Sequence, residues 1–409
     1  MQPTATIILA ACLVAPCRED VGFVKKTLTK DFLAEGCTAA DFNRDGHGDA
    51  CVGRFIWLGP EFAQRVAYTP ERENPAGITR TPYRADTGYS DYFEQFAHDF
   101  NGDGWPDVLV YGPPGEPASV FVNPGTAAAF AGDMSWTRHD VFAVANGESP
   151  DLVHVTGGAE PELLCHTGGQ FGFAEIDWKN PLAPARFRAI SPKTAESEKA
   201  IHRYTHGYGA GDVNGDGRID ILTNGGWYEQ PADLSDERLW TFHAANFGEG
   251  GAQMYALDVN GDDRADVITS IRAHSYGLSW FEQNADRTFT ERVILGRAAA
   301  DNANGAGFSQ IHAIRIEDID ADGLPDIVTG KRRWAHGPLG DDEPMAPPVL
   351  CWFKLVRDAS APGGARFVKH EIDNDSGVGT QFWTGRLSAD AKPDVIIGNK
   401  HGAFVFLQK

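Results

Sequence analysis

The stretch DVNGDGRIDILT at residues 212–223 places acidic, amide and glycine residues directly before a run of apolar side chains. Asp or Asn stands at its first, third and fifth positions, Gly at the sixth, and Asp again at the ninth. Such a loop brings several oxygen atoms to one point, and the Gly permits the tight turn between them. The apolar residues that follow predict a short buried strand.

The same pattern recurs along the chain as an internal repeat. Four further copies begin at residues 41, 99, 258 and 318, and two degenerate copies begin at residues 154 and 386. Neighbouring copies start between 46 residues apart (212 to 258) and 68 residues apart (318 to 386), which leaves room for four strands in each unit. Four-stranded units around a ring form a β-propeller. The sequence therefore predicts an all-β, seven-bladed propeller with four-stranded blades over residues 21–409.

The strand patterns also predict how the ring closes. Each unit has an aromatic third strand, as at residues 226–230, and an alternating fourth strand, as at residues 289–295. The last unit ends with its third strand at residues 404–408, and residues 23–29 resemble the fourth strands of the other units. We expect residues 23–29 to complete the last blade, because that pairing leaves no open sheet edge.

The five better-preserved loops are expected to bind metal ions. Clustered oxygen ligands in a flexible loop suit Ca²⁺ better than Mg²⁺, so we predict up to about five structural Ca²⁺ sites. The loop lacks the bidentate Glu of an EF-hand. In the alternative interpretation, Asp and Asn only bond to their own backbone in metal-free turns. The predicted calcium ligands are Asp41, Asn43, Asp45, Asp49, Asp99, Asn101, Asp103, Asp107, Asp212, Asn214, Asp216, Asp220, Asp258, Asn260, Asp262, Asp266, Asp318, Asp320, Asp322 and Asp326.

The charge balance excludes some functions. Acidic residues outnumber basic residues by 57 to 36, which gives a formal net charge of −21. A field of this sign repels phosphate backbones, so nucleic-acid binding is not expected. Outside the N-terminus no apolar stretch approaches the roughly 20 residues that span a bilayer, so no transmembrane segment is predicted. The composition does not determine the oligomeric state.

Residues 1–20 resemble a secretory leader. A short apolar core precedes Leu9-Ala10-Ala11-Cys12, which fits a bacterial lipoprotein cleavage box. No Lys or Arg precedes the apolar core, and the alternative interpretation is a misplaced start site or an untidy N-terminus. We expect a bacterial protein that is secreted, periplasmic or lipid-anchored. Cys37 and Cys51 either form a disulfide there or remain buried thiols.

The acidic loops resemble those of the FG-GAP or VCBS repeat propellers, over residues 23–409. Stretches such as residues 205–222, 309–320 and 329–338 are similar to a subgroup of secreted bacterial propellers and the propeller module of aldos-2-ulose dehydratase, a lyase that removes water from keto-sugars. We do not expect the cupin-type domains of that enzyme within these 409 residues, so the resemblance does not imply a later isomerisation step. The resemblance implies a secreted, calcium-binding propeller that acts on carbohydrate.

The repeat also indicates where functional residues gather. Each acidic loop joins a first strand to a second strand, so the opposite face receives the starts of the first strands and the loops after the second strands. Six residues before each loop start lie Glu35, Phe93, Glu148, His206, Ala252, His312 and Thr380. The second-strand loops add cationic and aromatic residues, among them His274, Tyr276, Lys331, Arg332, Trp334, His336 and Lys400. We expect these side chains to converge on one mouth of the axis, with Trp334 exposed.

Such a cluster suits elimination from a sugar that carries a carbonyl or carboxylate. Elimination needs a base, a cation for the enolate and an acid for the leaving oxygen. His206 or His312 is the predicted base, and Lys331 and Arg332 are the predicted enolate stabilisers. Tyr276, His274 or His336 is the predicted acid.

Two alternatives to this assignment remain. In the first, His206, His312 and His336 bind a divalent transition metal on the axis. In the second, the propeller only binds carbohydrate or protein, because a fold does not fix a function.

Overall fold

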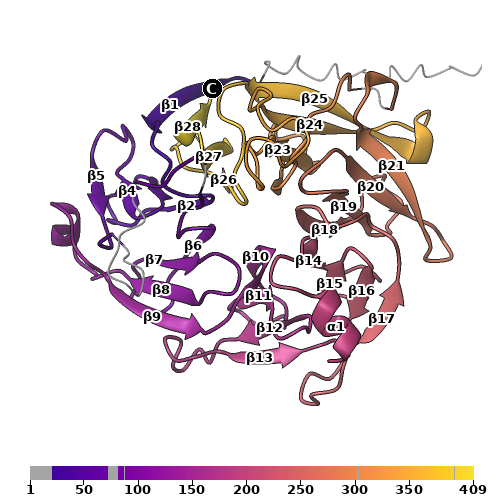
Figure 1. Cartoon of the computed structure of the whole chain (residues 1–409), viewed down its shortest axis with the longest axis horizontal. Helices are drawn as coiled ribbons and strands as arrows, with labels where there is room; N and C mark the ends of the chain where they lie inside the picture. Colours follow the sequence, from indigo (N-terminus) through magenta and orange to yellow (C-terminus); the bar gives the residue numbers. More distant parts are fainter. Residues whose placement is uncertain (1–20, 72–81, 87, 302–303, 391) are drawn as a thin grey trace, which may run out of the picture.

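The computed structural model describes residues 21–71, 82–86, 88–301, 304–390 and 392–409, and the predicted leader at residues 1–20, with Cys12, lies outside them. The described chain is all-β apart from short helices: α1 (Ala195–Ala200) and the 3-10 helices η1 (Ala127–Phe130), η2 (Ala299–Asp301) and η3 (Pro362–Gly364). Its strands are arranged as blades around a central axis (Figure 1). No helix in these ranges is long and apolar enough to cross a membrane.

Five sheets of the described chain have four strands each. One consists of β2 (Cys37–Ala40), β3 (Asp49–Val52), β4 (Phe55–Trp57) and β5 (Arg65–Ala67). The next consists of β6 (Glu94–His98), β7 (Asp107–Tyr111), β8 (Ala118–Val122) and β9 (Thr137–Phe142). A third consists of β10 (Asn146–Val153), β11 (Glu162–His166), β12 (Gly172–Glu175) and β13 (Arg186–Ala189). A fourth consists of β22 (Ile314–Glu317), β23 (Asp326–Gly330), β24 (Leu350–Arg357) and β25 (Ala365–Asp373).

The fifth four-stranded sheet closes the ring. It joins β26 (Trp383–Gly385), β27 (Asp394–Asn399) and β28 (Gly402–Gln408) to β1 (Phe23–Thr29). Strand β1 pairs antiparallel with β28, with Phe23 opposite Gln408 and Thr27 opposite Phe404. The predicted pairing of residues 23–29 with the last strand is therefore present.

The prediction of seven separate four-stranded blades is wrong. Within the described ranges there are five such blades, and the other eight strands form one continuous sheet. That sheet runs through β17 (Thr241–Ala244), β16 (Gly226–Glu229), β15 (Asp220–Thr223), β14 (Tyr208–Gly211), β18 (Gln253–Leu257), β19 (Asp266–Ser270), β20 (Leu278–Gln283) and β21 (Phe289–Leu295).

The eight strands join because the inner strands β14 and β18 pair in parallel, with Gly209 opposite Met254. A Cβ atom on Gly209 would lie only 2.0 Å from the carbonyl oxygen of Met254, so only glycine permits this approach. The repeat count does not reveal this pairing, because it depends on the closeness of two backbones. Inner strands also contact one another elsewhere around the axis (Figure 1).

The acidic loops are held by their own backbone. In the loop at residues 212–220, Asp212 accepts hydrogen bonds from the N–H groups of Asp216 (3.1 Å) and Gly217 (2.8 Å). In the loop that begins at Asp318, the Lys354 ammonium lies 2.6 Å from Asp322 and also contacts Asp320. The structure shows these loops as hydrogen-bonded turns and does not show calcium sites, so calcium binding stays a prediction.

In every loop except the one at residues 154–162, the ninth residue links three segments of a blade. Asp107, which is fully buried, accepts the N–H of Phe100 at 3.0 Å and the N–H of Asn123 at 2.7 Å. Its carboxylate thus ties the loop before β7 to the end of β8. Equivalent pairs of bonds reach Asp49, Asp220, Asp266, Asp326 and Asp394.

We expect the substitution Asp107→Ala to lower the free energy of unfolding by about 2–4 kcal/mol, because it leaves two buried N–H groups without an acceptor. Urea unfolding followed by circular dichroism measures the effect. The exposed Asp236, which accepts the N–H of Arg238 at 3.0 Å, provides the control, and Asp236→Ala should change stability far less. Equal losses in the two variants would contradict a structural role for the ninth residue.

Several single residues also test the sequence predictions. Trp227, Trp280 and Trp352 lie in third strands and are buried. Trp334, predicted to be exposed, is 2% exposed, because its ring packs against Tyr89 at a centroid distance of 6.4 Å.

The four cysteines of the described ranges are buried free thiols, and β-pairing sets Cys51 opposite Thr38 rather than Cys37.

Candidate functional site

A pocket of about 860 Å³ opens where the starts of the first strands meet the loops after the second strands. Its polar lining includes Glu148, His206, His274 and His336. Aromatic side chains complete the wall: Tyr89, Phe93, Phe171 and Tyr204. The pocket lies on the face that the repeat geometry predicts for functional residues.

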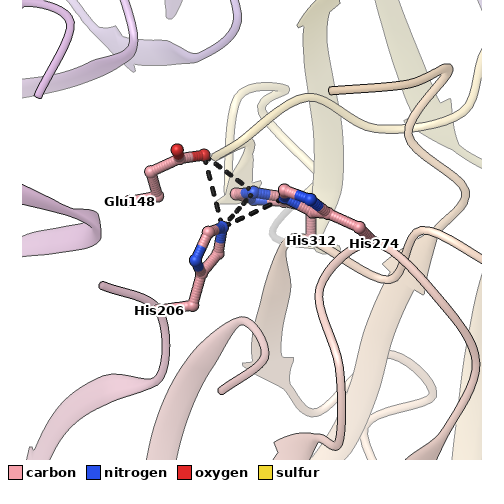
Figure 2. A group of neighbouring side chains, drawn as sticks. All are labelled: Glu148, His206, His274 and His312. Carbon is pink, nitrogen blue, oxygen red and sulfur yellow. Dashed lines mark hydrogen bonds and ion pairs between the residues drawn. The ribbon is translucent and has the colours of Figure 1, made fainter. Parts of the chain in front are cut away.

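Four side chains from different parts of the ring converge at this pocket (Figure 2). Glu148 belongs to β10, His206 and His312 directly precede β14 and β22, and His274 lies in the loop after β19. The nitrogen Nε2 of His206 lies 3.2 Å from Nε2 of His312 and 3.1 Å from Nε2 of His274. The oxygen Oε2 of Glu148 lies 3.1 Å from His312 Nε2 and 3.4 Å from His206 Nε2.

These distances fit a site for a divalent transition metal. Ligand atoms bound to one tetrahedral Zn²⁺ at about 2.0–2.1 Å are separated by roughly 3.3 Å. All four atoms of the cluster, one on each residue, lie within 4.8 Å of one another. Three imidazole nitrogens and one carboxylate oxygen are also a ligand set that zinc and similar ions prefer. The residues present therefore fit such an ion.

Burial keeps His274 and His312 in the form that binds a metal. His312 is fully buried, and burial together with the Arg332 charge lowers its pKa to about 4. Burial and the neighbouring imidazoles of His312 and His206 also lower the pKa of His274. Both imidazoles are therefore uncharged at neutral pH, as a metal ligand must be.

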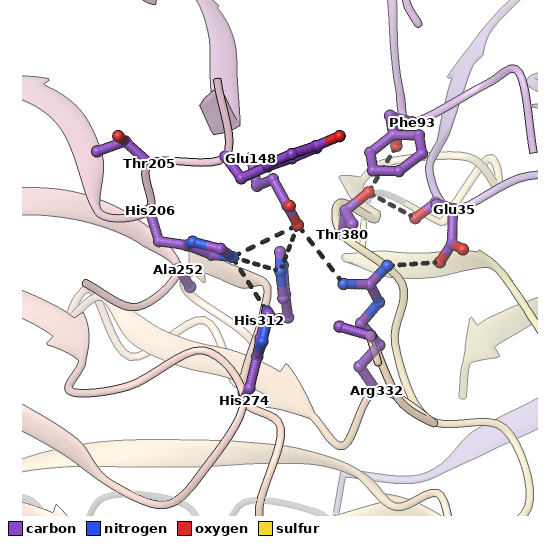
Figure 3. Close-up of polar contacts among 12 residues, drawn as sticks. Glu35, Phe93, Glu148, Thr205, His206, Ala252, His274, His312, Arg332 and Thr380 are labelled. Carbon is purple, nitrogen blue, oxygen red and sulfur yellow. Dashed lines mark hydrogen bonds and ion pairs between the residues drawn. The ribbon is translucent and has the colours of Figure 1, made fainter. Parts of the chain in front are cut away.

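A second layer of buried charges lies behind Glu148 (Figure 3). The Arg332 guanidinium lies 3.7 Å from Glu148 and 3.4 Å from Glu35, and it is 1% exposed. Lys400 contacts the other oxygen of Glu35 and is also buried. Burial would raise the pKa of Glu35, but the charges of Lys400 and Arg332 hold it below its usual value. Burial lowers the pKa of Lys400 to about 8.

The side chain of Arg332 carries N–H groups that the neighbouring residues leave without an acceptor. Its nitrogens Nε, Nη1 and Nη2 are buried, and in the described structure they have no hydrogen-bond partner. The nearby Glu94 is buried as well, and burial followed by the charge of Glu148 raises its pKa well above the usual range. Burial thus favours the neutral form of the Glu94 carboxyl group.

The face of His274 that points away from the cluster meets a further pair of residues. His274 Nδ1 lies 3.2 Å from Nδ1 of His336, and His336 Nδ1 lies 2.8 Å from Oδ1 of Asp341. Asp341 is held in place because its Oδ2 accepts the N–H of Ala335 (2.6 Å) and of His336 (2.9 Å). His336 and Asp341 belong to the long loop between β23 and β24.

The structure brings together only some of the residues predicted to be catalytic. His206, His274 and His312 meet directly, and His336 adjoins them through His274. Lys331 and Arg332 are buried and do not line the pocket, and Lys331 Nζ instead lies 2.8 Å from Ser309 Oγ.

Tyr276, also predicted to be catalytic, lies outside the lining, with its ring 5.0 Å from the Arg297 guanidinium. The sequence places Glu148 at the mouth of the axis but predicts no catalytic or metal-binding role for it. Its place at the same repeat position as His206 and His312 was the signal that could have identified it.

Comparison with protein families finds one match. Residues 258–329 match the FG-GAP-like repeat, which is less than half of the chain. This match supports the repeat part of the predicted resemblance and leaves the finer subgroup, with the dehydratase, as a prediction. No curated protein matches the sequence.

Several solved structures are similar in overall shape. One shows the recognition of non-reducing terminal N-acetylglucosamine by an Agrocybe aegerita lectin, with 14% identity, a TM-score of 0.48, and coverage of 95% of this chain and 85% of that chain. The exotype rhamnogalacturonan lyase YesX has 11% identity, a TM-score of 0.46, and coverage of 96% and 74%. The rhamnogalacturonan lyase YesW has 11% identity, a TM-score of 0.41, and coverage of 95% and 74%. At these values none of them assigns a function to this chain.

Proposed function

We propose that this protein is a carbohydrate lyase or dehydratase that depends on a divalent transition metal and eliminates across a bond next to a carbonyl or carboxylate of a keto- or uronic sugar. The observation that carries the proposal is the convergence of Glu148, His206, His274 and His312 at a pocket (Figure 2). In this proposal His206 and His312 bind the metal, so neither serves as the base. His274 binds the same ion rather than donating a proton.

The reaction needs a positive group beside the oxygen that gains charge. The C–H bond next to the carbonyl breaks, its electron pair forms the new C=C bond, and the bond to the leaving oxygen breaks as that oxygen takes up a proton. A Zn²⁺ or similar ion supplies a Lewis acid for the carbonyl or carboxylate oxygen when bound at this site. Arg332 holds Glu148 from behind and stabilises its charged, metal-binding form.

The buried charges favour an anionic ligand. Glu35 and Glu148 are negative, Arg332 and Lys400 are positive, and these four charges cancel. A divalent cation bound to the cluster therefore leaves a positive excess at the pocket floor. An excess positive charge in a low-dielectric site attracts a carboxylate or a developing enolate. This balance supports uronic sugars, or sugars that form an enolate, as substrates.

The pocket wall supplies sugar-binding and proton-transfer groups. Tyr89, Phe171 and Tyr204 present aromatic surface, which suits the apolar faces of sugar rings. His202 also lines the pocket, and its Nδ1 accepts the N–H of Tyr204 at 3.2 Å. Neutral His202 therefore carries its proton on Nε2, from which it can protonate a leaving oxygen. Glu249 also lines the pocket, and its carboxylate can accept a proton.

The proposal also includes features that the sequence predicts and the structure does not test. We propose that the five acidic loops bind structural Ca²⁺ and that the protein acts outside the cytoplasm, either secreted or anchored by lipid at Cys12. Calcium would offset the repulsion between the clustered carboxylates of each loop. Its removal should therefore lower the thermal stability of the whole ring.

The proposed function is tested by following the ultraviolet absorbance of a new enone or unsaturated uronate. The substrates are a panel of keto-sugars, 3-keto-glycosides and uronate polysaccharides. Protein stripped by a chelator and returned to calcium-containing buffer should be inactive, and added Zn²⁺ or Mn²⁺ should restore activity. Calcium alone should not restore it, because the acidic loops and the histidine cluster bind different classes of ion.

The alternative function gives a different result. A propeller that only binds sugar would produce no absorbance change with any substrate, and its glycan binding would survive removal of the transition metal. That pair of results would contradict catalysis and leave a carbohydrate-binding protein. Elimination activity that survives removal of the transition metal would contradict only the dependence on metal.

A further inference from the structure

A second set of metal-ligating atoms adjoins the four-residue cluster. His274 Nδ1, His336 Nδ1 and Asp341 Oδ1 lie within 4.8 Å of one another. The two ring nitrogens of His274 face different neighbours, since Nε2 lies 3.1 Å from His206 Nε2 and Nδ1 lies 3.2 Å from His336 Nδ1. His274 is thus placed between two groups of ligand atoms.

The second group is built around a fixed carboxylate. The Asp341 side chain is 1% exposed, and its Oδ2 is occupied by the N–H groups of Ala335 and His336. Its Oδ1 faces two imidazole nitrogens, at 2.8 Å for His336 and 3.9 Å for His274. The loop backbone thus holds one carboxylate oxygen in position before any ligand binds.

No placement of protons on His274 and His336 gives all three ligand atoms a favourable hydrogen-bond partner. When His274 Nε2 binds the metal of the first cluster, neutral His274 carries its proton on Nδ1. If His336 Nδ1 is also protonated, two N–H groups face each other across 3.2 Å. If His336 Nδ1 is not protonated, its lone pair faces the Asp341 carboxylate across 2.8 Å. A cation among the three atoms removes both conflicts, because each atom then donates an electron pair.

We propose that His274 Nδ1, His336 Nδ1 and Asp341 Oδ1 bind a second divalent transition metal ion, which His274 bridges to the ion of the first cluster. Binding of the second ion releases the Nδ1 proton of His274 to solvent. The inference rests on the proposed function through its metal centre, because the bridge requires His274 Nε2 to bind the first ion.

The second site differs from the first in its access to substrate. The first cluster has four protein ligands, which complete a tetrahedral shell, whereas the second has three. His336 is 63% exposed at the pocket wall. A metal ion there keeps a position open to the pocket, where water or a sugar oxygen can bind. The second ion would thus offer a substrate oxygen an open position, whereas the first ion would take a substrate oxygen as a fifth ligand.

The test counts zinc by elemental analysis. Chelator-stripped protein is reloaded with Zn²⁺ in calcium-containing buffer, and unbound metal is removed. We expect two zinc ions per chain in the parent protein, one in His336→Ala and one in Asp341→Asn. The control is His243→Ala, which should retain two. His243 pairs with Glu229 at 2.7 Å, outside the pocket lining, so it is a matched histidine–carboxylate pair without a third ligand.

The outcomes separate this inference from the proposed function. One zinc ion in the parent that persists in His336→Ala overturns the second site and leaves the first intact. No zinc in the parent overturns both. Two zinc ions that persist in both His336→Ala and Asp341→Asn also overturn the second site. Circular dichroism of each variant shows whether it is folded, and the exposed His336 is the safer of the two positions to change.

A second measurement tests the bridge itself. Protein loaded with Cu²⁺ at both sites should show a weakened electron paramagnetic resonance signal, because an imidazolate bridge couples the two spins. His336→Ala should restore the signal of an isolated Cu²⁺ ion. Two uncoupled signals in the parent would contradict the bridge through His274.

Discussion

His312→Ala is expected to lower zinc affinity by about a thousand-fold or more, and to reduce elimination at least as severely at limiting zinc. His312 is fully buried, and its Nε2 lies within 3.2 Å of both Glu148 and His206. Loss of a residue that only supports a metal ligand costs about 10–100-fold in affinity, so loss of a ligand should exceed that range. Elimination should fall because the oxygen that gains charge loses its stabilising cation.

The control for this prediction is another buried histidine. His166 is 1% exposed, and its ring packs against Phe171 and Tyr208 rather than joining the metal cluster. His166→Ala removes the same volume from a buried position, so it should reduce stability while leaving zinc affinity unchanged. Competition titration against a chromophoric chelator measures the affinities. Equal affinities for the parent and His312→Ala would contradict the assignment of His312 as a ligand.

Lys400→Met is expected to lower the free energy of unfolding by about 3–5 kcal/mol, the usual cost of removing one partner of a buried ion pair. Lys400 contacts Glu35, which is fully buried. The Lys400 ammonium also lies 4.4 Å from the ring centroid of Tyr89 and 4.7 Å from that of Trp334. The substitution preserves much of the contact with these rings, so the loss should come mainly from the Glu35 carboxylate, which keeps only the Arg332 guanidinium at 3.4 Å.

A double substitution distinguishes the loss of the ion pair from the loss of side-chain packing. Glu35→Leu combined with Lys400→Met should recover most of the lost stability, because an apolar pair replaces the ion pair. Lys193→Met removes an exposed partner of Glu198 and should cost much less. Urea unfolding measures all the variants. A double variant no more stable than Lys400→Met would show that the lysine stabilises the core by packing instead.

The strands were largely predictable because their patterns repeat. The acidic loops mark the strands that follow them, and Asp220–Thr223 and Asp326–Gly330 lie where the pattern predicts. The number of separate blades was not predictable from spacing. It depends on hydrogen bonds between β14 and β18, which form because Gly209 lets two backbones approach.

The candidate site was predictable where it follows the repeat. His206 and His312 occupy one repeat position, and their side chains meet as that position implies. The loop between β23 and β24 is much longer than its counterparts in the other units, so its internal contacts leave no periodic signal. For this reason the sequence did not show that Trp334 is buried or that Asp341 faces His336.

The pairing of β1 with β28 has a consequence for protein synthesis. A ribosome makes residues 23–29 early, but their partner strand emerges only after nearly all of the described chain. Glu35 is likewise synthesised long before its ion-pair partner, because Lys400 follows it by 365 residues. A nascent chain therefore carries an unpaired strand edge throughout translation, which exposes it to aggregation until the ring closes. We expect a molecular chaperone to shield β1 during that interval.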